Sequence, residues 1–263
     1  MAITAKDVQA LRQATGVGMM DAKRALEASD GDFEAATQWL RVQGLASAAK
    51  RADREAGEGD VAVVRDGSAA AIVELRCETD FVAKSDAFVA LADEMATQVA
   101  AHGEGALDEF RERLEQLLTT LKENISVGRV VRLSAGPGEV VETYLHQQSG
   151  RGVIAVAVVV ANATPEVVHE VAVHIAFARP QYVTRDEVPA DLVAAERATV
   201  EEISRHEGKP EAALPKIVEG RLNAWFKDRV LLEQAYVRDE KMSVEQFLHG
   251  ATVRAFAQVV VGA

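Results

Sequence analysis

"VAVVRDGSAAAIVELRCETDFVAK", residues 61–84, predicts two antiparallel strands followed by the start of a helix. Two runs rich in valine and alanine flank Asp66-Gly67, and Asp-Gly between such runs is a strong hairpin signal. A helix is expected next, because apolar residues then recur at helical spacing. They are Phe88, Leu91, Ala92, Met95 and Val99. The stretch therefore predicts a hairpin that is covered on one face by a helix.

The same pattern occurs a second time. Residues 140–162, "VVETYLHQQSGRGVIAVAVVVAN", again predict two strands around a glycine-containing turn, and Pro165 opens a helix. That helix has an apolar face formed by Val168, Ala172, Ile175 and Ala176. Between the two units, residues 107–122 predict a further amphipathic helix. The repeat predicts an α+β fold with two related hairpin-plus-helix subdomains.

The first fifty residues predict a small unit of three helices. Thr4 and Asp7 form a capping box for the first helix, and "TGVGMM" (15–20) and "SDGD" (29–32) separate the three. Phe33 and Trp39 are expected to fill the small core. A charged linker follows and is expected to be helical until about Gly57.

The last third of the chain predicts a projecting arm and a C-terminal module. Residues 191–207 are strongly charged, and a returning helix follows with Pro215 in its first turn or at a kink. Ser243 and Gln246 predict a second capping box, and residues 251–261 predict a strand that returns to a sheet. The expected divisions are a three-helix domain (1–50), a linker (51–58), two core subdomains (59–139 and 140–185), a helical hairpin arm (186–227) and a C-terminal module (228–263).

Composition narrows the class of protein. The formal net charge of −12 disfavours direct binding to a nucleic-acid backbone and favours a basic protein partner. The single cysteine, Cys77, excludes an internal disulfide and is typical of a reducing cytoplasm. The sequence has no signal-peptide core and no apolar run long enough to span a membrane. We expect a soluble, cytoplasmic protein without membrane contact.

No arrangement of residues predicts a catalytic centre. His169 and His174 are five apart, and five residues turn a helix by about 500°, so their rings face different ways. We expect one solvent-edge histidine and one packed histidine. Strand parity places Cys77 on the apolar face, where a free cysteine is inert. The chain is therefore expected to have no enzyme activity, no cofactor and no metal.

The junction "TDFV", residues 79–82, has two interpretations. Alternation along the strand places Thr79 and Phe81 on the buried side, with Asp80 capping the next helix. Alternatively, the strand has already ended and a loop presents Asp80 and Phe81 outward as a binding tip. Alternation and helical spacing favour the buried position.

Several blocks together resemble the elongation factor Ts family of bacteria. The N-terminal unit is similar through "LRQATGVGMMDAKRAL" (11–26) and "GDFEAATQWLRVQG" (31–44), and the core through "ELRCETDFVAK" (74–84). "VAVHIAFARPQYV" (171–183), "PKIVEGRL" (215–222) and "LLEQAYV" (231–237) follow in the same order. The resemblance covers essentially the whole chain. It implies a guanine-nucleotide exchange factor that binds elongation factor Tu in its GDP-bound and nucleotide-free states.

The resemblance also implies which residues contact the partner. The matched "TDFV" tip, Thr79, Asp80, Phe81 and Val82, would enter the partner near its magnesium site and dislodge the ion, which outweighs the buried interpretation of Phe81. Further contacts are implied at Val17, Gly18, Met19, Leu145 and His146, whereas Met20 is expected to lie in the core. The N-terminal unit also resembles ubiquitin-associated modules. A non-catalytic adaptor that binds proteins through this unit is the alternative.

Overall fold

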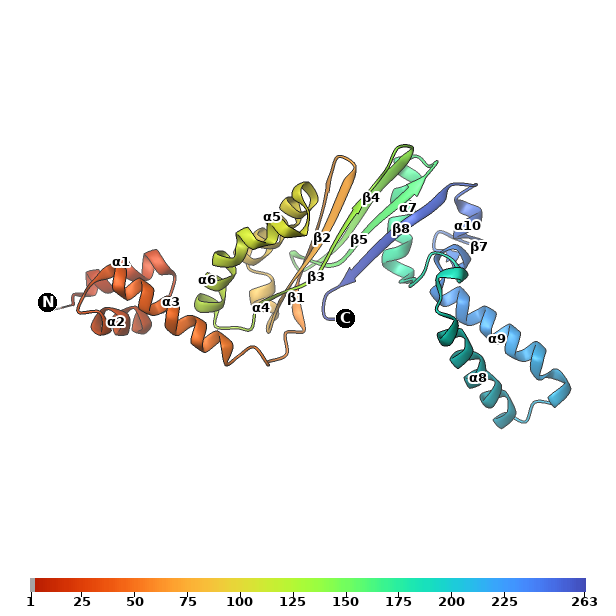
Figure 1. Ribbon diagram of the computed structural model, residues 1–263, viewed down its shortest axis with the longest axis horizontal. Helices are drawn as coiled ribbons and strands as arrows, with labels where there is room; N and C mark the ends of the chain where they lie inside the picture. The colour runs from red at the N-terminus through yellow and green to blue at the C-terminus, as the bar shows by residue number, and fades with distance from the viewer. Residues whose placement is uncertain (1–2) are drawn as a thin grey trace.

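A computed structural model describes residues 3–263 of the chain, and Figure 1 shows an elongated molecule. Three helices lie at the N-terminal end, two antiparallel sheets occupy the middle, and a pair of long helices projects at the other end. Mixed helix and sheet of this kind confirms the expected α+β class. Among residues 3–263, no helix combines the length and apolar character that crossing a membrane would require.

The N-terminal unit consists of α1 (Ala5–Thr15), α2 (Met19–Ala28) and α3 (Phe33–Ala49). The Thr4–Asp7 capping box is confirmed, and Gly16 ends α1 with a left-handed φ of 72°. Its core is built from small and aliphatic side chains: Val8, Leu11, Val17, Ala22, Ala25, Leu26, Ala36 and Leu40. The prediction that Phe33 fills this core is wrong. Phe33 is the first residue of α3 and 44% exposed, and Trp39 only packs against the edge of the cluster.

The linker is not helical as expected. α3 ends at Ala49, and residues 50–57 contain only turns and irregular chain before the first strand. A physical reason lies in Asn124, whose Nδ2 donates to the carbonyl oxygens of Ala52 (3.1 Å) and Arg54 (2.7 Å). These bonds stabilise the turn conformation, because the two carbonyls have an amide partner outside a helix.

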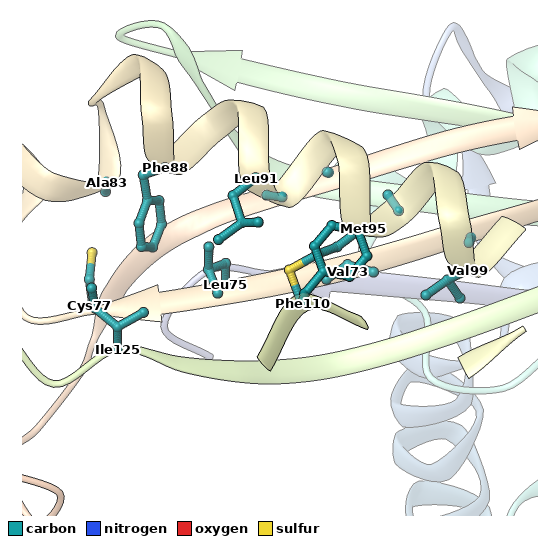
Figure 2. Packing of buried hydrophobic residues seen from close by; sticks show 14 of the residues in the cluster. Val73, Leu75, Cys77, Ala83, Phe88, Leu91, Met95, Val99, Phe110 and Ile125 are labelled. Atoms are coloured by element: carbon teal, nitrogen blue, oxygen red, sulfur yellow. The ribbon is translucent and has the colours of Figure 1, made fainter. Parts of the chain in front are cut away.

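The first sheet contains β1 (Glu58–Asp66), β2 (Ala69–Cys77) and β3 (Ser126–Ser134) in that order. Asp66 pairs with Ala69, so the predicted Asp-Gly hairpin is confirmed, with Gly67 at a φ of 56°. α5 (Asp86–His102) covers one face, and Figure 2 shows its apolar side chains pointing onto β2. The amphipathic helix expected over residues 107–122 corresponds to the 3-10 helix η1 (Glu104–Phe110) followed by α6 (Arg111–Leu121).

The second sheet contains β4 (Glu139–Gln148), β5 (Arg151–Ala161) and β8 (Thr252–Val260) in that order. α7 (Pro165–Ala178) packs on it, and the predicted C-terminal strand is confirmed as β8. Of the two histidines on α7, His174 is buried and His169 is exposed, as expected. The two sheets pack together through a shared cluster that includes Val61, Ile72 and Val159.

The arm consists of α8 (Ala190–His206) and α9 (Leu214–Arg229), which contact each other through Val200, Val218 and Leu222. Pro215 lies in the first turn of α9, where a missing N–H costs nothing. The C-terminal module adds β6 (Ala235–Tyr236), β7 (Asp239–Ser243) and the short α10 (Val244–Phe247) before β8. The Ser243–Gln246 capping box is confirmed.

Candidate functional site

Residues 79–82 form an exposed tip between the first sheet and α5. β2 ends at Cys77, and Thr79 is the N-cap of the one-turn helix α4 (Asp80–Ala83), its hydroxyl accepting from Val82 N at 3.4 Å. The side chain of Phe81 is 83% exposed. The prediction from strand alternation is therefore wrong: alternation stops two residues before Thr79. The expectation that Asp80 caps the helix is also wrong, because Thr79 does so.

The base of the tip is held by residues that are distant in sequence. Oε2 of Glu123 accepts the backbone N–H groups of Glu78 and Thr79, both at 3.0 Å, and its Oε1 accepts the Thr79 hydroxyl at 2.5 Å. Glu78 in turn accepts the N–H of Asn124 at 2.6 Å. Sequence reasoning missed Glu123, because nothing local connects it with a tip 44 residues earlier. The hydroxyl of Thr79 is thus engaged within the chain.

The tip has an inward and an outward side. Ala83 is buried and Val82 is half-buried, both against the cluster under α5. Asp80 pairs with Lys84 at 2.5 Å, and this hydrogen bond lowers the pKa of the Asp80 carboxyl. Asp80 therefore remains charged at neutral pH, while Phe81 presents an apolar ring beside it.

Cys77 lies directly beneath the tip and is chemically quiet. Its thiol is buried and donates to the carbonyl oxygen of Thr79 at 3.2 Å. Burial, with a further contribution from the Glu123 carboxylate, raises the pKa of Cys77 to about 12. The thiol therefore stays protonated at neutral pH and packs as a core residue, as expected.

Leu145 and His146 lie at the end of the second sheet that adjoins the tip. Arg151, which follows the β4–β5 turn, donates to Glu58 Oε2 and to the carbonyl of Gly59, both at 2.6 Å. Glu58 is the strand partner of Cys77, so the turn and the tip share one end of the molecule. His146 is exposed and lines a shallow pocket with Arg151, whereas Leu145 is partly buried between the sheets.

The N-terminal unit contributes an apolar surface at the start of α2. Met19 is 55% exposed and Met20 is 65% exposed, so the expectation that Met20 lies in the core is wrong. Gly18 is exposed as the N-cap of α2. Val17, in contrast, is only 4% exposed within the three-helix core and offers no side chain to a partner. The side chain of Val17 therefore serves the fold, and the implied contact at Val17 stays a prediction that would have to involve its backbone.

The N-terminal unit is docked onto α6. Arg41 bonds Glu115 at 2.8 Å, and Arg51 donates to the carbonyl of Leu118 at 3.0 Å. Gly44 lies so close to Thr119 that a Cβ at this position would overlap the threonine side chain. Lys122, at the end of α6, bonds Asp21 in the first turn of α2 at 2.7 Å. These contacts fix the exposed methionines relative to the rest of the chain.

The tip, the end of the second sheet at His146 and the start of α2 are three exposed areas that are typical of a protein that binds another macromolecule. They offer an outward aromatic ring, a charged neighbour and two methionines on braced backbone, which suits contact with another macromolecule. Within residues 3–263, no group of three or more histidine, cysteine or acidic side chains is placed to hold a metal ion.

Comparison with known proteins defines the family. The family model described as Elongation factor TS matches residues 78–263. Elongation factor Ts of Clavibacter michiganensis is 47% identical, covering 99% of this chain and 98% of that protein. The Leifsonia xyli protein of the same name is 45% identical, covering 99% of both chains, and that of Mycobacterium ulcerans is 45% identical, covering 98% of both. The chain belongs to the elongation factor Ts family.

Proposed function

We propose that this chain binds elongation factor Tu in its GDP-bound form and promotes GDP release by inserting the tip Thr79–Val82 near the partner's magnesium site. Membership of the family makes it a nucleotide exchange factor of translation elongation, with elongation factor Tu as its partner. The observation that carries the proposed site is Phe81, a large apolar side chain that is 83% exposed on a braced turn. An aromatic ring presented on a turn that the fold holds in place is well suited to burial in a partner's surface.

Each tip residue has a separate role in the proposal. Phe81 acts as a wedge that displaces neighbouring elements of the partner, and charged Asp80 bonds to groups exposed by that displacement. Thr79 and Val82 hold the turn, through the hydroxyl bonds and the core contact described above. Magnesium bridges nucleotide phosphates and protein ligands, so disturbing its site removes a large electrostatic part of nucleotide affinity.

The tip requires additional contacts. Accelerating release ~1,000-fold lowers the barrier by about 4 kcal/mol. Burying one phenylalanine contributes about 1.5–3 kcal/mol. We therefore include Gly18, Met19 and Met20 on the N-terminal unit, and His146 with the backbone at Leu145, as surfaces that hold the partner. We also propose that the chain is divided into the six parts expected from the sequence, from the three-helix domain (1–50) to the C-terminal module (228–263).

The nucleotide states follow from thermodynamic linkage. If the bound chain weakens the partner's hold on GDP, then GDP weakens the partner's hold on the chain by the same factor. We propose that affinity is highest for nucleotide-free partner and that GTP entry releases the chain. An adaptor built on the three-helix unit would bind the partner without changing nucleotide release, and family membership favours the exchange factor.

Release of labelled GDP from purified elongation factor Tu tests the proposal. Catalytic amounts of the chain should accelerate release. Phe81→Ala should reduce kcat/KM roughly tenfold or more, because about 1.4 kcal/mol corresponds to a factor of ten. Phe177→Ala is a matched control, since Phe177 is 78% exposed on α7 and lies outside the proposed site. Both variants should keep the wild-type melting temperature. Equal activity of the two variants would refute the role of Phe81.

A further inference from the structure

Three consecutive residues after α6 connect three different parts of the chain. Lys122, in a left-handed conformation with φ of 59°, bonds Asp21 of the N-terminal unit. Glu123 bonds the base of the tip, and Asn124 bonds the linker carbonyls of Ala52 and Arg54. We refer to residues 122–124 as the junction. Its side chains fix the tip relative to the N-terminal unit, although these segments are far apart in sequence.

The carboxylate of Glu123 accepts three hydrogen bonds from one short segment of the chain. Both carboxylate oxygens are used, and all three donors lie in the two residues directly before α4. α4 itself has four residues, which is far below the length at which a helix is stable alone. The direction in which Phe81 points therefore depends on contacts from outside the helix. Glu123 supplies the bonds that hold Thr79, the N-cap of α4, and the preceding Glu78.

We propose that Glu123 is a positioning residue for the exchange reaction, and that the junction sets the spacing between the tip and the methionines of α2. The effect on exchange rests on the proposed function of the tip. Without the carboxylate, the N–H groups of Glu78 and Thr79 lose their protein acceptor and turn to water, which favours other conformations of the turn. Small displacements of a reacting or wedging group are costly, because productive geometry is narrow.

Glu123→Ala and Glu123→Gln test this in the full chain. Glutamine keeps one carbonyl acceptor for the two N–H groups but replaces the second oxygen with a donor, so it should restore part of the activity. Glu170→Ala is the matched control, because Glu170 also accepts two bonds, from Tyr236 (2.8 Å) and Arg238 (2.7 Å), in the C-terminal part of the fold. We expect Glu123→Ala to lower kcat/KM about tenfold, mainly through kcat, and Glu170→Ala to leave it unchanged.

A double-mutant cycle with Phe81→Ala separates positioning from general destabilisation. If Glu123 acts through the tip, removing Phe81 should cost much less in the Glu123→Ala background than in the wild type. Fully additive losses, or exchange by Glu123→Ala within about twofold of wild type, would overturn the proposal.

Mobility of the tip can be measured independently of GDP release. Hydrogen exchange at the Glu78 and Thr79 amides should accelerate in Glu123→Ala and stay unchanged in Glu170→Ala. Unchanged protection of these amides would also overturn the proposal. If the wild-type chain failed to accelerate GDP release from elongation factor Tu, the proposed function would be refuted. The amide measurement would still decide whether Glu123 positions the tip.

Discussion

Replacing Asp60 by asparagine should stabilise the protein at neutral pH and make that gain depend on pH. Asp60 is buried in β1, and its Oδ1 accepts the N–H of Gly152 in β5 at 2.7 Å, across the contact between the two sheets. Burial raises the pKa of Asp60 from 3.8 to about 6, although the Gly152 hydrogen bond opposes the shift and nearby Asp93 adds to it. Asparagine is neutral and keeps an oxygen that accepts the same bond.

The sign follows from the direction of the shift. A carboxyl whose folded-state pKa lies above its unfolded value contributes stability below 3.8, and loses it as the pH rises through 6. The full difference is roughly 3 kcal/mol, since each pKa unit corresponds to about 1.4 kcal/mol. Roughly 1–1.5 kcal/mol of it falls between pH 5 and pH 7. The free energy of unfolding of Asp60→Asn, relative to that of the wild type, should therefore rise by roughly 1–1.5 kcal/mol between pH 5 and pH 7.

Urea unfolding at several pH values measures this difference. Circular dichroism is the suitable probe, because Trp39 and Trp225 lie in α3 and α9 and not in the sheets that Asp60 joins. Asp53→Asn, which removes an exposed carboxylate in the linker, controls for the general loss of negative charge. A stability difference between Asp60→Asn and wild type that stays constant from pH 5 to pH 7 would refute the reasoning.

Three further predictions concern the contacts that position the site. Arg151→Ala should reduce GDP release from elongation factor Tu, because Arg151 joins the two sheets at Glu58, close to the tip. Arg65→Ala is the control and should leave release unchanged, since Arg65 joins the same sheets through Glu142 (2.5 Å) at the end remote from the tip. Gly44→Leu should make residues 50–57 more sensitive to limited proteolysis, since a side chain there would force the N-terminal unit away from Thr119. Native Cys77 should resist alkylation by iodoacetamide at pH 8 and react once unfolded in urea, because burial raises its pKa to about 12; rapid native alkylation would contradict the buried position.

Local signals in the sequence were sufficient for much of the fold. Asp66-Gly67 specifies its turn through residues that are adjacent in the chain, and the spacing of Phe88 and Leu91 specifies the buried face of α5. Two capping boxes were predicted for the same reason, because each depends on residues three apart. Such features need no knowledge of distant segments.

The candidate site depended on distant contacts that no local pattern contains. Alternation along β2 placed Phe81 inside, but the chain leaves the strand at Cys77 and its next residues are bound by Glu123. The linker was expected to be helical because Asn124 could not be foreseen as its partner. Met20 is expected in the core because it is apolar, yet the small unit fills its core with alanine, valine and leucine side chains. The residue pattern left an outward tip as the less favoured alternative, and the family resemblance is what favours it.

The proposed role of the tip in nucleotide exchange requires that the tip be held rigidly by the rest of the chain. An inserted side chain can displace elements of a partner only if its own backbone is held more rigidly than those elements. Phe81 lies in a helix of only four residues, α4. The N-cap of α4, Thr79, is bonded to Glu123, Val82 packs on the α5 core, and the Arg151 bridge from the second sheet lies nearby. The exposed methionines are tied to the same junction through Lys122 and Asp21. In the proposed exchange reaction, binding energy gained at α2 and at the second sheet would drive the tip into the partner, and such differential binding would accelerate GDP release.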